Sequence, residues 1–118
     1  MNMALNRKKY QNALLYLCRK LGGEIRGKKK LAKLLYFVDF DFFEKYQRPI
    51  TGDVYKAYPK GPLPVALNDI IEEMVGKKML QIDSMQEWGK EYAPTEVYRC
   101  IAEPDDSIFD PEEKKILE

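Results

Sequence analysis

The segment Leu31–Tyr46, LAKLLYFVDFDFFEKY, most constrains what this chain can fold into. Its apolar residues recur at the spacing of one helix face, and four of the chain's five phenylalanines lie in it. Further aromatic side chains cover most of the other sides of the same helix, at Tyr36, Phe37, Phe40 and Phe43. Because a helix that is apolar nearly all round is normally buried, we expect a central buried helix over residues 28–46 with the other elements packed around it.

Two carboxylates, Asp39 and Asp41, interrupt this apolar surface. An ionised carboxylate is costly to bury unless it is paired or hydrogen-bonded. We therefore expect one of the two to point outward and the other to be held by a partner inside the protein. Residues two positions apart face different sides of a helix, so the pair does not converge for acid–base chemistry.

Helical patterns also flank this segment. Residues 6–21 place their apolar side chains on one face, with Asn6 as a suitable N-cap and Gly22-Gly23 as a stop. A second amphipathic pattern starts at Leu67 and ends at Gly76. Pro62 or Pro64 can take the first position of that helix, where a missing N–H costs nothing.

The end of the chain carries a strong helix start. Asp110-Pro111-Glu112-Glu113 places Asp at the N-cap, Pro at the first position and Glu at the third. A helix from about residue 110 is short, so we expect either that it docks tightly on the core or that the natural chain extends beyond Glu118.

Strand patterns are fewer and shorter. Residues 54–58 alternate weakly, and residues 78–85 and 95–102 are rich in Ile, Val, Tyr and Thr. We predict a small β-hairpin over about residues 78–102. The fold class is then α+β and predominantly helical, and 118 residues correspond to a single domain spanning 1–118.

Composition excludes several classes of function. Histidine is absent, which removes histidine-dependent nucleophile systems and histidine metal sites. Cys18 and Cys100 are predicted to be reduced packing residues. No glycine-rich phosphate loop or metal-ligand cluster is present. We therefore predict a protein that is not an enzyme and holds no cofactor or metal. Without an apolar span or a signal peptide, the expected setting is the cytoplasm, with no membrane partner.

Charge is spread unevenly along the chain. Residues 1–35 contain ten Lys or Arg and one acid, whereas residues 61–118 contain six Lys or Arg and fourteen acids. The run Lys28–Lys30 opens a helix, where the macrodipole disfavours cations. This run is interpreted either as a solvated charge run or as a patch for an acidic partner or phosphates.

The order of helices followed by a hairpin also suits a winged-helix DNA-binding regulator. The helix from Leu67 would then be the recognition helix, but it carries Asp69, Glu72 and Glu73, and an acidic helix is poorly suited to the major groove of DNA.

One combination of motifs is informative. KLLYFVDF at residues 33–40 is followed by Ile50-Thr51-Gly52, then Tyr55 and Ala57, and then Gly61-Pro62-Leu63-Pro64. Over roughly residues 7–103 this order resembles the Panacea, or SocA-type, antitoxin domain, a family that includes phage-associated GepA-like proteins. Val38 replaces a common Ala, and Gln47-Arg48-Pro49 stands where a Gly-rich turn is usual.

The resemblance implies a non-catalytic antitoxin that neutralises a cognate toxin by direct binding. An adaptor that delivers its toxin to a protease is the alternative within the family. The motif residues are then expected to be structural, namely Asp39, Thr51, Gly52, Tyr55, Gly61, Pro62 and Pro64. Asp39 is predicted to accept hydrogen bonds from the loop at residues 50–53, with Thr51 as one donor.

The toxin-binding surface is predicted in two places. The first is a basic patch of Arg26, Lys28, Lys29 and Lys30. The second is the pair Tyr58 and Lys60 beside the Gly-Pro turn.

Overall fold

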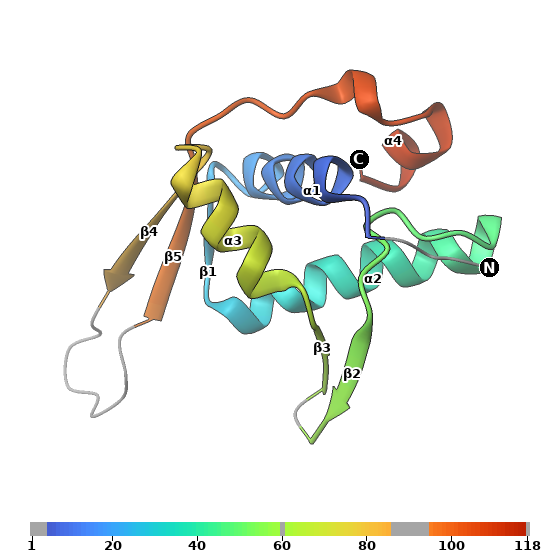
Figure 1. Cartoon of the computed structure of the whole chain (residues 1–118), viewed down its shortest axis with the longest axis horizontal. Helices are drawn as coiled ribbons and strands as arrows, with labels where there is room; N and C mark the ends of the chain where they lie inside the picture. Colours follow the sequence, from blue (N-terminus) through green and yellow to red (C-terminus); the bar gives the residue numbers. More distant parts are fainter. Residues whose placement is uncertain (1–4, 60, 86–94, 118) are drawn as a thin grey trace.

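The computed structural model describes residues 5–59, 61–85 and 95–117. These residues form an α+β fold that is predominantly helical, as predicted. The helices are α1 (Arg7–Lys20), α2 (Lys28–Tyr46), α3 (Leu67–Gly76) and α4 (Pro111–Leu117), with a short 3₁₀ turn η1 (Asp106–Ile108). Figure 1 shows α1 in the middle of the molecule, β1, β4 and β5 at the left, β2 and β3 projecting at the bottom, and the segment that leads to α4 arching above α1.

The ends of α1 follow the predicted capping chemistry. The Asn6 side chain accepts a hydrogen bond from the backbone N–H of Lys9 at 3.0 Å. At the other end Gly22 has a φ of 93°, and the Gly23 N–H donates to the Cys18 carbonyl at 2.9 Å. This is the glycine-terminated arrangement that satisfies the last carbonyls of a helix.

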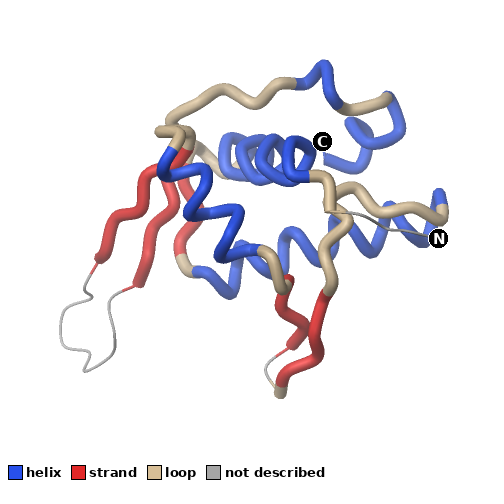
Figure 2. Tube along the Cα trace, in the orientation of Figure 1, coloured by secondary structure: helices blue, strands red, loops and turns tan. Residues whose placement is uncertain are grey.

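The strands form two separate sheets (Figure 2). The predicted hairpin is β4 (Leu80–Met85) paired antiparallel with β5 (Thr95–Cys100), and the segment 86–94 between them lies outside the described residues. A third strand, β1 (Glu24–Arg26), pairs with β5, and the sequence patterns predicted no strand there. Three residues are too few to show alternation, so this strand is defined by its partner.

The second sheet is a ribbon of β2 (Tyr55–Tyr58) and β3 (Gly61–Pro64). The prediction that Pro62 or Pro64 begins the helix at α3 is therefore wrong, because both lie in β3 and the N-cap of α3 is Ala66. The Val65 N–H donates to the Val54 carbonyl at 2.9 Å, so the N–H groups of the odd-numbered residues of this strand point towards β2. The even-numbered positions point away from β2, to the free edge of the ribbon. A proline there, which has no N–H, removes no hydrogen bond between the strands.

Helix α2 has the predicted bounds but is buried on one side only. Leu31, Leu35 and Phe42 are fully buried and belong to one core cluster with side chains of α1, α3 and β4. Phe37, Phe40 and Phe43 are 65%, 50% and 37% exposed, so the prediction of burial nearly all round is wrong. The remaining elements do not suffice to cover a helix of this length on every side.

Helix α4 docks on the core through a buried carboxylate. The Glu113 N–H donates to Asp110 Oδ1 at 2.9 Å and the Asp110 N–H donates to Glu113 Oε1 at 3.0 Å, which is the predicted capping box. Lys9 Nζ lies 2.7 Å from Glu113 Oε2. Arg48 reaches Asp110 at 2.8 Å and stacks 4.7 Å above the Phe42 ring. The charge on Glu113 is thus compensated from α1 and from the loop after α2.

The two cysteines are free, in agreement with the sequence. The buried Cys18 thiol lies 3.4 Å from the Tyr98 carbonyl, to which it can donate. Burial, with the neighbouring Cys100, raises the pKa of Cys18 to about 12, which keeps the group protonated and unreactive at neutral pH. None of the described helices combines the length and the apolar character that crossing a membrane requires.

Glu73 on α3 joins that helix to α1. Its carboxylate accepts from Arg7 Nε at 2.9 Å and from the Gln11 amide, and it pairs with Lys77. The Arg7 guanidinium first, and Lys77 second, lower the pKa of Glu73 below its ordinary value of 4.5. A lowered pKa means that the stabilisation is present above the ordinary value and is lost as pH falls through the folded-state value.

We therefore predict that Glu73→Gln lowers the melting temperature at pH 7 and that its difference from wild type shrinks below about pH 4.5, as the wild-type carboxylate is itself protonated. Thermal unfolding followed by circular dichroism over a pH series measures this. Glu72→Gln is the matched control, since Glu72 is exposed. A Glu73→Gln difference of equal size at pH 3 and pH 7 would contradict the assignment.

Candidate functional site

The site is built around Asp39, which is 5% exposed in the middle of α2. Its Oδ1 accepts from the backbone N–H groups of Ile50 and Thr51 at 3.0 and 2.9 Å. Its Oδ2 accepts from the Thr51 hydroxyl and from the Tyr55 hydroxyl, the latter at 2.6 Å. The predicted hydrogen bonds from the 50–53 loop are present, and Asp41 is the exposed member of the pair.

A second carboxylate, Asp53, continues the network. It accepts from the Tyr10 hydroxyl at 2.6 Å and from the N–H of Ala66 at 3.1 Å, at the start of α3. The Asp53 N–H donates to the Thr51 hydroxyl oxygen at 3.1 Å. Gly52 between them has a φ of 77°, a left-handed conformation that favours glycine. Asp39 and Asp53 thus tie α1, α2, the ribbon and α3 together.

Both tyrosines in this network remain hydrogen-bond donors at neutral pH. Burial, reinforced by Asp53, raises the pKa of Tyr10, and burial, reinforced by the charge of Asp39, raises the pKa of Tyr55. A phenolate at either position would face a carboxylate at hydrogen-bond distance. The two hydroxyls therefore act as fixed hydrogen-bond donors that hold the network together.

Aromatic rings of α2 line a shallow cavity of about 200 Å³ beside this network. The Tyr36 ring stacks on Phe40 at 5.4 Å between centroids and meets the Tyr55 ring edge-on at the same distance. Phe43 and Pro49 complete the apolar wall. The rings hold one another in position, and their exposed faces remain available for contact.

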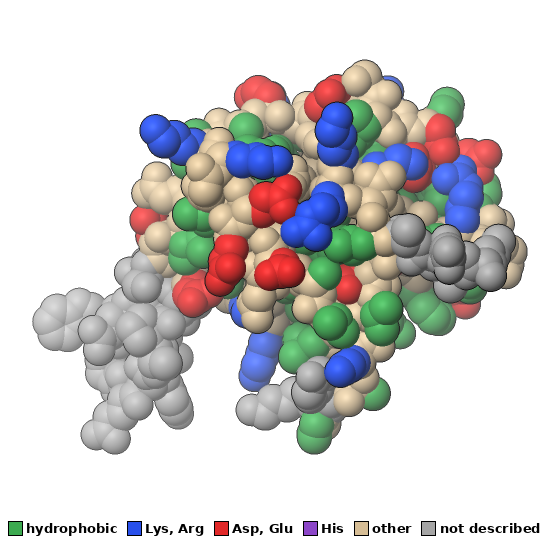
Figure 3. All heavy atoms as spheres, in the orientation of Figure 1, with side chains coloured by type: hydrophobic (Ala, Val, Ile, Leu, Met, Phe, Trp, Pro, Cys, Tyr) green, Lys and Arg blue, Asp and Glu red, His purple; other side chains and the backbone are tan. Residues whose placement is uncertain are grey.

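The ribbon of β2 and β3 has two different faces. Tyr55 and Pro64 are cross-strand partners, and Tyr55 points to α2 while Pro64 is buried. Because side chains alternate along a strand, the neighbouring residues face outward. These include Val54, Leu63 and Val65, which are 64%, 39% and 54% exposed. Figure 3 shows hydrophobic side chains gathered over this part of the molecule.

The predicted basic patch is only partly free. Arg26 forms an ion pair with Glu24 of the same strand, β1, at 3.6 Å. Lys28 donates a hydrogen bond to the Asn68 side chain at the start of α3. Lys29 and Lys30 are exposed, and among the described residues neither pairs with a carboxylate. The Lys28 contact places this patch next to the base of the ribbon.

The second predicted toxin-binding pair falls largely outside the description. Tyr58 ends β2 and pairs in register with Gly61, but its side chain is not described. Lys60 lies outside the described residues. The backbone therefore places Tyr58 at the tip of the ribbon, the part farthest from α3 in Figure 1.

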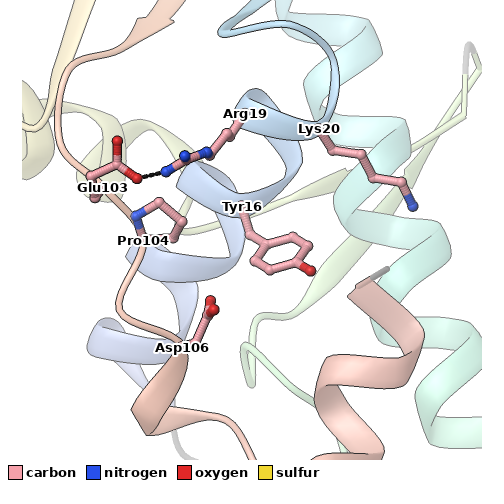
Figure 4. Close-up of a pocket in the computed structure, with 6 residues that line it drawn as sticks. All are labelled: Tyr16, Arg19, Lys20, Glu103, Pro104 and Asp106. Carbon is pink, nitrogen blue, oxygen red and sulfur yellow. Dashed lines mark ion pairs between the residues drawn. The ribbon is translucent and has the colours of Figure 1, made fainter.

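A larger cavity of about 480 Å³ lies between α1 and the segment 103–106. Arg19 of α1 reaches across to Glu103 as an ion pair, beside Tyr16 and Pro104 (Figure 4). Charges of both signs line this cavity. No group of three or more His, Cys, Asp or Glu side chains that could hold a metal ion occurs in the described part of the chain.

Sequence reasoning missed Asp53 and the outward residues of the ribbon. Asp53 follows the Ile-Thr-Gly motif directly, and an Asp after a tight turn could have been read as a second hydrogen-bond acceptor. The exposure of Val54, Leu63 and Val65 had no comparable signal, because it depends on which side of the ribbon α2 covers.

Replacing Asp39 tests the network. We predict that Asp39→Asn lowers the free energy of unfolding by about 2–4 kcal/mol, because an amide nitrogen would face donors that now bind a carboxylate oxygen. Urea unfolding measures this. The matched control is Asp41→Asn on the exposed side of the same helix, for which the expected change is within about 0.5 kcal/mol. Equal small effects at both positions would refute the role of Asp39.

Comparison with known proteins places this geometry in a family. A family model described as "Antitoxin SocA-like, Panacea domain" matches residues 31–118. No curated protein and no solved structure matches the chain. The matched segment starts later than the resemblance seen in the sequence and continues through α4. It contains Asp39, the loop at 50–53 and the whole ribbon. The chain therefore belongs to the SocA-like antitoxin family that is defined by the Panacea domain.

Proposed function

We propose that this chain is the antitoxin of a toxin–antitoxin pair and neutralises its toxin by binding it directly, without catalysis, in the cytoplasm. Membership of the antitoxin family supports the general role. The observation that carries the mechanism is the ribbon. The ribbon is anchored by hydrogen bonds among the motif residues Asp39, Thr51 and Tyr55. Its outer face is exposed and largely apolar.

The outer face of the ribbon has the character of a protein-binding surface. Exposed apolar side chains on a rigid element lose little conformational entropy when a partner covers them. Val54, Leu63 and Val65 lie together because the residue pairs 54–65 and 56–63 are opposite each other across the ribbon. Lys56 is exposed on the same face and adds a positive charge. An apolar toxin surface with carboxylates at its edge fits this arrangement.

The basic patch of Arg26 and Lys28–Lys30 is the second part of the proposed surface. Helix α2 begins there at Gly27, which supplies no side-chain cap. The N-terminal end of a helix is itself positive, so the lysines and the helix end attract the same anionic group. We include Tyr58, at the ribbon tip, and Lys60, which follows it closely in the sequence, as a further part of the proposed surface.

The DNA-binding alternative is less well supported by the same structure. Among the described residues α3 is the helix that would enter the groove, and Asp69 and Glu72 are exposed on it. Carboxylates facing phosphates oppose binding. The protease-adaptor alternative also requires toxin contact and is separated from sequestration by whether the toxin disappears in cells.

The proposed role predicts a stable complex with the product of the neighbouring gene. Co-expression should rescue growth and yield a co-purified complex. The triple variant Val54→Ser, Leu63→Ser, Val65→Ser should lose most of the rescue, since the complex would bury these side chains and each Å² of apolar surface removed from water contributes about 25 cal/mol.

The matched control is Val75→Ser with Ile101→Ser, which changes exposed apolar residues outside the ribbon. No rescue by the wild-type chain would refute the antitoxin role. Rescue by the triple variant equal to that of the control would instead remove the ribbon from the interface. Rescue with loss of the toxin protein would indicate an adaptor.

Charge reversal tests the basic patch separately. We predict that changing Arg26, Lys28, Lys29 and Lys30 to Glu weakens toxin binding and flattens its dependence on salt, because charges at an interface are screened by ions. Calorimetry at two salt concentrations measures this. The double variants Lys29→Glu/Lys30→Glu and Lys78→Glu/Lys115→Glu carry the same charge change at exposed sites. Equal affinities for these two variants would rule the patch out.

A further inference from the structure

Five exposed side chains lie in one line along α2. They are Lys30, Lys33, Phe37, Asp41 and Glu44, separated by intervals of 3, 4, 4 and 3 residues. With 3.6 residues per turn, all five fall within about 40° of the direction of Phe37. The stripe runs from two cations through an aromatic ring to two carboxylates, and the intervals are symmetric about Phe37.

The interactions of these side chains within the chain are few. Among the described residues Lys30, Lys33 and Glu44 have no ion-pair partner. Asp41 lies 3.6 Å from Lys45, with both side chains more than half exposed, and such a pair contributes little. Phe37 is 65% exposed, and its one ring contact in the described part of the chain is with the edge of Tyr36, at 5.9 Å between centroids.

The symmetry of the stripe identifies the partner that it fits. If a second α2 lies antiparallel with Phe37 opposite Phe37, position 33 lies opposite position 41 and position 30 lies opposite position 44. Each lysine then faces a carboxylate of the other copy. The flanking apolar residues match in the same way, because Leu34 and Phe40 are equally distant from Phe37. A two-fold interface requires this self-complementarity.

We propose that the chain forms a two-fold symmetric dimer through this stripe of α2, with a second copy of itself as the occupant. A nucleic acid fits less well, because Asp41 and Glu44 would face phosphates. The interface is a single pair of helices and is small, so the dimer is weak, with a dissociation constant on the order of micromolar.

This interface shares Lys30 with the proposed basic patch and Phe40 with the wall of the cavity beside the ribbon, and its other residues lie outside the proposed toxin-binding face. Tyr36 and Phe43, which line the cavity beside the ribbon, lie about 100–120° around the helix from Phe37. Lys30 belongs to both the basic patch and the stripe, so the test uses Lys33 and Asp41 instead. The proposal concerns the chain alone and does not depend on toxin neutralisation.

Sedimentation equilibrium of the purified full chain tests the dimer. The expected mass rises with protein concentration from one chain towards two. In the dimer, position 33 of each copy lies opposite position 41 of the other. Lys33→Asp places two carboxylates at each of these two contacts, and Asp41→Lys places two cations at each. Each variant should therefore dimerise about tenfold more weakly or worse. An equimolar mixture of the two variants should recover dimer, because each carboxylate at position 33 or 41 of the first variant then faces a cation of the second.

Disulfide trapping locates the two-fold axis. Phe37→Cys should cross-link to itself under mild oxidation, whereas Ile101→Cys, also exposed but on another element, should not. Circular dichroism confirms that each variant is folded. A wild-type chain that stays monomeric at every concentration would overturn the proposal. If Phe37→Ser then weakened toxin binding in that monomeric chain, the stripe would be a toxin contact and not a dimer interface. A dimer that tolerates both charge changes, or a mixture that recovers nothing, would overturn the stripe as its interface.

Discussion

The structure depends on one buried carboxylate. Asp39 sits in the middle of an apolar helix, where an unpaired charge would be strongly destabilising, and it is accepted there because four donors converge on it. Three of those donors come from Ile50 and Thr51 and the fourth from Tyr55. Satisfying Asp39 therefore fixes the loop after α2 and the first residue of β2 at the same time. Asp53, held by the same loop, extends the constraint to Tyr10 in α1 and to the start of α3.

This arrangement separates the residues that build the fold from those that we propose meet a partner. The polar groups of Asp39, Thr51 and Tyr55 face inward and bond to one another. What they hold in place is a short ribbon with an exposed apolar outer face and, next to its base, the positive start of α2. A scaffold of this kind can change its outward side chains without disturbing the network behind them.

Much of the local structure could be predicted from particular residues. Asn6, Gly22 and the Asp110–Glu113 capping box mark helix ends through hydrogen bonds that span only a few residues, and all appear in the structure. Because a buried charge needs a partner, one of Asp39 and Asp41 could be expected to be held inside the protein, and the family resemblance pointed to Asp39. The exposure of Phe37 and Phe40 could not be predicted, since helical periodicity shows which residues share a face but not whether another element covers that face.

The sequence by itself determined which segments are helices, the caps at Asn6, Gly22-Gly23 and Asp110, the need for a partner at a carboxylate of α2 and the family to which the chain belongs. Only the tertiary structure decided that Gly61–Pro64 is a strand, that Glu24–Arg26 joins the sheet and that one side of α2 stays open. The physical reason is the same in each case. Caps and periodicity act over a few residues, whereas the pairing of β3 with β2, the pairing of β1 with β5 and the covering of α2 depend on segments far apart in the chain.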